Sequence, residues 1–166
     1  LGNVENQFTS DTVVLIKENN TWKISFDNLI KHYSYTDSCG TSGSIKLCIH
    51  DVYIFPDKAM FVGNANNSSN AKYTFGFAAP VSILTVLDNN SEVRGQFPSV
   101  HNGQSHSSAT LLPSDNKIVF YFGTPMDPQL VKDKPTYFAI NQLKKLGWGD
   151  MPSLSDKGKQ IDINLK

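Results

Sequence analysis

The stretch from Ser44 to Phe55, S44-I-K-L-C-I-H-D-V-Y-I-F55, has the strongest strand pattern in the chain. From Ile45 onward an apolar residue alternates with another kind, which is the period of two of a half-buried strand. At His50 the phase changes, so either a bulge re-aims the strand or its second half is covered on both faces. Both interpretations put this stretch at the centre of a sheet.

Shorter apolar segments recur on both sides of this stretch, and turn-forming residues separate them. This spacing predicts a mainly β fold, either an antiparallel β-sandwich or an open barrel, formed by one domain that spans residues 1–166. The polar block at 63–71 is expected to be a surface loop. The expected strands are a hairpin at 13–26 and segments at 59–62, 73–77, 82–87, 93–97, 109–112, 117–122 and 161–165.

One long helix is expected near the C-terminal end, at about 135–146. Pro135 suits a first helical turn, and Gly147 suits the position just after the last. At 26–33 the apolar spacing is also helical, so a short helix is preferred to a strand there. The apolar residues with helical spacing in the longer segment are Phe138, Ile140, Leu143 and Leu146.

The chain has 15 basic and 15 acidic residues, so its formal net charge is zero. A balanced charge removes the attraction that draws basic proteins to nucleic acid or to anionic membranes. No apolar run approaches the roughly eighteen residues of a membrane-spanning helix. We therefore expect neither nucleic-acid binding nor membrane insertion.

Two cysteines, Cys39 and Cys48, flank a short Gly/Ser-rich loop. They have no histidine or second cysteine pair at a metal-binding spacing, so a disulfide that closes a hairpin is preferred to a metal site or to two reduced cysteines. Closing a loop of this length would contribute about 2.5 to 3 kcal/mol to stability. A disulfide predicts an oxidising compartment, so the protein is expected to be secreted, periplasmic or on the cell surface.

Histidines provide the alternative of an enzyme. If the fold brought His50, His101 and His106 together, they could ligate a metal ion, or they could form a hydrolase triad with a serine at 105–108. The chain has no GxSxG, GxGxxG or P-loop motif to support either site. We therefore favour separate histidines, with no cofactor, no metal and no assigned catalytic residue, over a metal-dependent or Ser/His hydrolase.

Polar loops and exposed aromatic residues favour a binding function. Asn, Ser and Gly supply adaptable hydrogen-bonding groups, and Trp148, between two glycines, supplies a flat face of the kind that contacts sugars or protein loops. The sequence thus favours a non-catalytic secreted or cell-surface recognition module, preferably glycan-binding or adhesive, whose partner is a glycan or another surface protein. The other alternative is a structural subunit or protein-interaction component of a surface assembly, with an unpaired sheet edge or an apolar patch. The predicted ligand contacts are Trp148, Asn64, Asn66, Asn67, His101, Asn102, Gln104 and His106.

Overall fold

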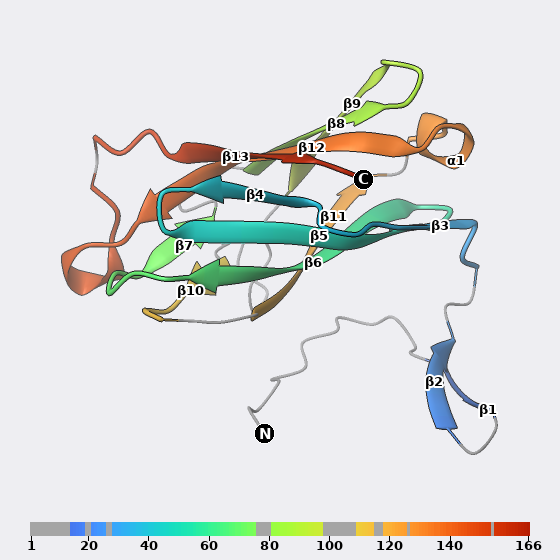
Figure 1. Ribbon diagram of the computed structural model, residues 1–166, viewed down its shortest axis with the longest axis horizontal. Helices are drawn as coiled ribbons and strands as arrows, with labels where there is room; N and C mark the ends of the chain where they lie inside the picture. The colour runs from blue at the N-terminus through green and yellow to red at the C-terminus, as the bar shows by residue number, and fades with distance from the viewer. Residues whose placement is uncertain are drawn as a thin grey trace.

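The computed structural model describes residues 14–18, 21–25, 28–75, 81–97, 109–114, 118–125, 127–153 and 155–166. Within them, two antiparallel sheets face each other as a sandwich that does not close into a barrel, which confirms the predicted fold class (Figure 1). The strands are β1 (Val14–Glu18), β2 (Thr21–Ser25), β3 (Lys31–Ser34), β4 (Cys39–Ser42), β5 (Ile45–Ile54), β6 (Lys58–Asn67), β7 (Tyr73–Phe75), β8 (Val81–Leu87), β9 (Glu92–Phe97), β10 (Ala109–Leu111), β11 (Ile118–Pro125), β12 (Pro135–Lys145) and β13 (Lys159–Asn164). The helices are α1 (Gln129–Lys132) and the 3-10 helix η1 (Trp148–Asp150).

The first sheet is built around β5. Its order is β11-β6-β5, and both β3 and β4 pair with the other edge of β5. The predicted central strand is therefore confirmed. The register shifts between Ile49 and Asp51, so the bulge is the correct explanation of the phase change at His50. Ile49 and Val52 are fully buried, whereas His50 and Asp51 between them are half-buried.

The second sheet is built around β12. Its order is β10-β7-β12-β8-β9, in which β7 and β8 follow one another along the same edge of β12. β13 pairs with the other edge of β12. Figure 1 shows β12, β8, β9 and β13 together in one layer, opposite the layer that contains β5 and β6. The β1–β2 hairpin predicted at 13–26 is present and lies apart from both layers in the same view.

The helix predicted at 135–146 is wrong, because this segment is β12. The register slips between Ile140 and Leu143, and Gln142 has a φ of 62°, so a β-bulge adds one residue to the alternation. Phe138, Ile140 and Leu143 all face the core, and the gap of three across the bulge imitates one face of a helix.

The shorter helix preferred at 26–33 is also wrong. Residues 26 and 27 lie outside the described residues, Asn28 is in a turn, and residues 31–34 form β3. β3 pairs with the second half of β5, from Asp51 to Ile54. Pairing with a neighbouring strand therefore outweighs the local helical spacing, as tertiary context commonly does.

The surface loop predicted at 63–71 begins later than expected, because β6 continues to Asn67. A Cβ on Gly63 would lie 1.8 Å from the backbone oxygen of Cys48 on β5. This glycine therefore allows two strands to approach closely, and it does not mark a turn. Ala65 and Asn67 are buried, so the first half of the polar block belongs to the sandwich.

The predicted disulfide is present. Cys39 on β4 and Cys48 on β5 are directly paired in the register, with an S–S distance of 2.01 Å. The bridge ties the β4–β5 hairpin together on the first sheet. Neither helix in the described part of the chain has the length or hydropathy of a membrane-spanning segment.

Side chains from both sheets form the core, where the rings of Phe61 and Phe138 lie 5.0 Å apart. The sheets also meet at one edge, where a Cβ on Gly40 of β4 would lie 2.0 Å from the backbone oxygen of Asp162 on β13. The backbone of Lys166 accepts a bond from Thr36 and donates one to the Ser38 hydroxyl. Since β13 is held on both sides, the outer face of the second sheet is a well-supported surface.

Candidate ligand-binding site

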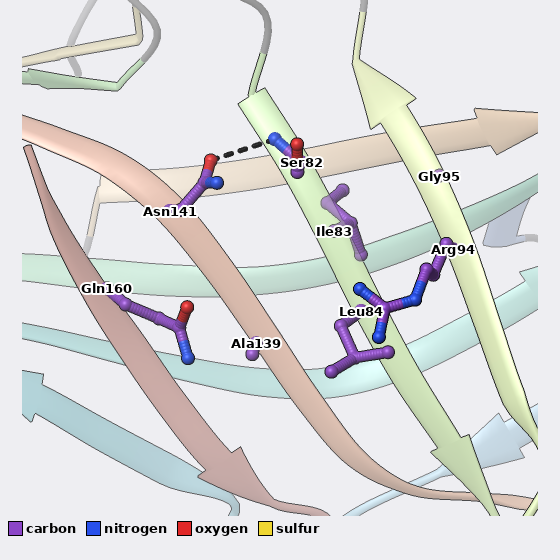
Figure 2. Close-up of a pocket in the computed structure, with 8 residues that line it drawn as sticks. All are labelled: Ser82, Ile83, Leu84, Arg94, Gly95, Ala139, Asn141 and Gln160. Atoms are coloured by element: carbon purple, nitrogen blue, oxygen red, sulfur yellow. Dashed lines mark hydrogen bonds between the residues drawn. The ribbon is translucent and has the colours of Figure 1, made fainter.

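The outer face of the second sheet is recessed at Ala139. The register aligns Arg94 with Leu84, Leu84 with Ala139, and Ala139 with Asp162, across β9, β8, β12 and β13. Ala139 has the smallest side chain in this row and is only 3% exposed. The result is a hollow of about 460 Å³ (Figure 2). The hollow is lined by Ser82, Ile83, Leu84, Arg94, Gly95, Ala139, Asn141 and Gln160.

Asn141 is held at the rim of the hollow by the neighbouring strand. The backbone N–H of Ser82 on β8 donates to Asn141 Oδ1 over 2.8 Å, as the dashed line in Figure 2 shows. Asn141 lies in the bulge of β12, where the ladder between strands is interrupted. Within the described residues the amide nitrogen of Asn141 has no hydrogen-bond partner. The site therefore keeps a fixed donor at this position.

Gln160, on β13, lies beside the bulge of β12 that contains Asn141, and Asp162 holds its side chain. Gln160 Nε2 donates to Asp162 Oδ1 over 2.6 Å, and the Tyr137 hydroxyl donates to the same carboxylate oxygen. This bond to Asp162 raises the pKa of Tyr137 to about 12, and partial burial adds to the shift. The raised pKa keeps the Tyr137 hydroxyl protonated, and thus a donor to Asp162, to a higher pH than an ordinary tyrosine. Among the described residues, Gln160 Oε1 has no partner and is left as an acceptor.

Arg94 is the one charged side chain among the described residues that line the hollow. Its Nη2 donates to Glu92 Oε2 over 2.6 Å, and its side chain is 72% exposed. Figure 2 shows the guanidinium turned across β8 toward Ala139. The hollow thus offers donors from Arg94 and Asn141 and an acceptor from Gln160 above an apolar floor. The described residues of its lining are polar or apolar apart from Arg94, and Ser82 adds a hydroxyl beside them.

The outer face of the first sheet carries a different polar cluster, in which His32, Ser34 and Asp51 contact one another. His32 Nε2 lies 2.7 Å from Asp51 Oδ1, and the Ser34 hydroxyl donates to the same oxygen over 3.1 Å. The ring of His32 also stacks on Tyr53, with centroids 4.5 Å apart. In a catalytic triad the imidazole stands between serine and carboxylate. Here serine and imidazole share one carboxylate oxygen, so the cluster does not have the geometry of a triad.

The predicted metal or triad site at His50, His101 and His106 is only partly placed. His50 Nε2 accepts a hydrogen bond from Asn64 Nδ2 over 2.8 Å. His101 and His106, together with the predicted contacts Asn102 and Gln104, lie outside the described residues. Their convergence therefore stays a prediction. Within the described ranges, no group of three or more His, Cys, Asp or Glu residues could hold a metal ion.

The predicted ligand contacts at 64–67 lie on β6 rather than on a loop. Asn64 is bonded to His50, and Asn66 is half-buried. Asn67 is 1% exposed, and its amide donates to the backbone oxygens of Ala71 (2.7 Å) and Leu112 (2.8 Å). Asn67 faces inward from the strand and holds the adjoining loops together. It is therefore not placed to contact a ligand at the surface.

Trp148 is 99% exposed at one end of the sandwich. An isolated bridge between Leu146 and Pro152 and a bond from Gly147 N to Met151 O (2.8 Å) close its turn. Two other exposed apolar side chains, Met151 and Leu112, lie at the same end. Leu146 N donates to Lys72 O, and the side-chain amide of Asn67 donates to Leu112 O, so both segments adjoin residues 67–72. We call Leu112, Trp148 and Met151 the tip. The ligand role predicted for Trp148 stays a prediction.

Arg94, Asn141 and Gln160 were not singled out from the sequence. Asn141 fell within the segment assigned to a helix. The outward orientation of Gln160 could have been predicted, because Gln160 and Asp162 alternate with the buried residues Ile161 and Ile163 in the predicted closing strand. Comparison with protein-family descriptions and with curated proteins found no match to this chain. The functional assignment therefore depends on the geometry of its own residues.

Proposed function

We propose that this protein is a non-catalytic carbohydrate-recognition module that binds its ligand in the hollow on the second sheet. One observation carries the proposal. Arg94, Asn141 and Gln160 come from different strands, and each is held by a neighbour while keeping polar atoms unused at the hollow. Side chains that are already held lose less conformational entropy when a ligand binds.

The chemistry of the lining suits a sugar. Each hydroxyl of a sugar both donates and accepts a hydrogen bond, and the hollow provides the donors Arg94 and Asn141 and the acceptor Gln160. Ala139 and Leu84 supply an apolar floor for the C–H face of a pyranose ring. A few fixed polar groups over an apolar floor are the usual composition of a small-ligand site.

The disulfide between Cys39 and Cys48 supports a location outside the reducing cytosol. A secreted or cell-surface protein meets glycans on cells and in the extracellular matrix. A recognition or adhesion role is therefore the form of carbohydrate binding that we propose.

A glycan array provides the test, repeated with Asn141→Ala and Gln160→Ala. We expect the unaltered protein to bind a defined set of glycans and each variant to bind them more weakly. Asn64→Ala is a matched control, because Asn64 is an amide on the outer face of the other sheet, bonded to His50. Binding that survives both changes in the hollow, or an array without any signal, would contradict the proposal.

A second candidate function is protein interaction through the tip. Three of the four large apolar side chains that are exposed in the described residues lie at this end, namely Leu112, Trp148 and Met151. Exposed apolar side chains are more frequent at surfaces that contact another protein. For this function, Trp148→Ala should weaken capture of a protein partner by about 1 to 3 kcal/mol and leave glycan binding unchanged. Loss of glycan binding in Trp148→Ala, with Asn141→Ala unaffected, would instead move the sugar site to the tip.

A further inference from the structure

We infer that the ligand of the hollow is an acidic saccharide whose carboxylate binds Arg94. This inference rests on the proposed carbohydrate function and names the class of sugar. Among the described residues that line the hollow, Arg94 carries the one charge, and its bond to Glu92 occupies one of its N–H groups. A neutral sugar would leave that cation without a ligand group of opposite charge, whereas a uronic or sialic acid would supply one.

The guanidinium of Arg94 has the capacity for a second partner. Of the five N–H donors of an arginine, the bond to Glu92 uses one at Nη2. The remaining N–H groups lie in the plane that pairs with both oxygens of a carboxylate. The bond to Glu92 also holds the guanidinium in orientation, and Figure 2 shows it directed toward Ala139 at the centre of the hollow.

Neighbouring groups favour a single negative charge over a larger one. Arg94 is the only cation that the described part of the lining contains. The carboxylates of Glu92 and Asp162 lie on the same sheet face, in the rows around Ala139. A phosphate carries a charge of about −1.5 to −2 at neutral pH and would meet more repulsion with less compensation. Asn141 Nδ2 adds a neutral donor. One planar carboxylate on a sugar ring is therefore the best match.

Two substitutions should change the preference for acid in opposite directions. Arg94→Gln removes the cation, so the acidic ligand should lose its advantage over the neutral one. Glu92→Gln removes a competing negative charge but keeps an oxygen that can accept from Arg94, so affinity for the acidic ligand should rise. Both side chains are exposed, so we expect both variants to keep the fold, and circular dichroism checks this. Lys46→Gln, which removes an exposed cation from β5 on the other sheet, is the matched control.

The experiment uses sialyllactose, a hyaluronan tetrasaccharide and a galacturonate tetrasaccharide, each beside the same compound with its carboxyl groups reduced to alcohols. Calorimetry at low salt should show that at least one acidic form binds about twofold to fivefold more tightly than its reduced form, as expected for an exposed ion pair. The difference should shrink at high salt and disappear in Arg94→Gln, while Lys46→Gln keeps it.

Equal binding of the acidic and reduced forms would overturn the inference and leave the proposed carbohydrate function standing. Binding of neutral glycans alone would likewise overturn the acidic-saccharide inference and leave the carbohydrate function standing. Failure of every acidic, reduced and neutral glycan to bind would overturn both. The sialic and uronic acid compounds distinguish the two sources of the carboxylate.

Discussion

The two outer faces of the sandwich both carry polar side chains, but they use them differently. On the first sheet, His32, Ser34 and Asp51 satisfy one another, and Asn64 is bonded to His50. On the second sheet, Asn141 and Gln160 each use one polar atom within the protein and keep the other at the hollow. Unused hydrogen-bonding capacity beside a recess, rather than the number of polar residues, therefore distinguishes the second face from the first.

The size of the central side chains accounts for part of this difference. Ala139 occupies the middle of the second sheet, between Leu84 and Asp162. On the first sheet the outward positions of β5 and β6 pair Asp51 with Val62 and Tyr53 with Met60. These side chains are larger than that of Ala139, so they fill the outer face of β5 and β6. A recess therefore forms where the central strand carries a small residue.

Removing the disulfide should have the largest effect on stability and the smallest effect on the hollow. We expect the double variant Cys39→Ala, Cys48→Ala to lose about 2.5 to 3 kcal/mol in free energy of unfolding, because the loop it closes in the unfolded chain is released. Denaturant unfolding measures this loss. Ligand affinity at a temperature where the variant stays folded should equal that of the unaltered protein. A fall in affinity under those conditions would show that the two faces are coupled.

Filling the recess should strongly weaken binding without unfolding the protein. Ala139→Leu places a larger side chain at the floor of the hollow, and we expect affinity to fall by more than about tenfold, or about 1.4 kcal/mol. Val62→Leu makes a comparable change on the outer side of β6 and should leave affinity unchanged. Calorimetric titration measures both. Normal binding by Ala139→Leu would place the ligand elsewhere.

A matched pair of asparagines should show a smaller contrast. Asn141→Ala removes a donor from the hollow, and one neutral hydrogen bond contributes about 1 kcal/mol, so we expect about a fivefold loss of affinity. Asn64→Ala removes an amide that is bonded to His50 on the first sheet, and affinity should stay the same. Equal losses in the two variants would indicate a general effect on stability instead of a contact.

The smallest effect concerns Tyr137 and pH. The bond to Asp162 raises the folded-state pKa of Tyr137 to about 12 from the usual 10.0. The stability that this bond contributes should be fully present below pH 10.0 and should be lost as the pH rises through about 12. Ultraviolet titration of the phenolate measures the shift. In Asp162→Asn, which removes the charged acceptor, Tyr137 should titrate at lower pH, and an unchanged titration would contradict the assignment.

The sequence predicted those parts of the fold that depend on local alternation. Ile45, Leu47 and Ile49 identify β5, and Ile161 and Ile163 identify β13, because a strand with one buried face repeats every two residues. The β12 segment was mistaken for a helix, since the bulge at Gln142 changes the spacing of its core residues from two to three. A bulge depends on pairing with distant strands, which local spacing does not report.

The hollow was harder to predict than the strands. It requires Arg94, Ala139 and Gln160 to meet across β9, β12 and β13, and that meeting depends on strand order and register. The predicted contacts at 64–67 followed from polar composition alone, and Asn67 proved to face inward because β6 extends through it. Composition indicates which residues can bind a ligand, but the register decides which of them face a common recess.

Side-chain amide resonances provide the most direct measurement of where the ligand binds. The tightest-binding oligosaccharide from the array would be titrated into isotope-labelled protein, and the NH₂ signals of Asn141, Gln160 and Asn64 followed by NMR. We expect the signals of Asn141 and Gln160 to shift in a saturable manner and that of Asn64 to stay in place. Saturable shifts of Asn64 or of the Trp148 indole, with Asn141 and Gln160 unchanged, would contradict binding in the hollow.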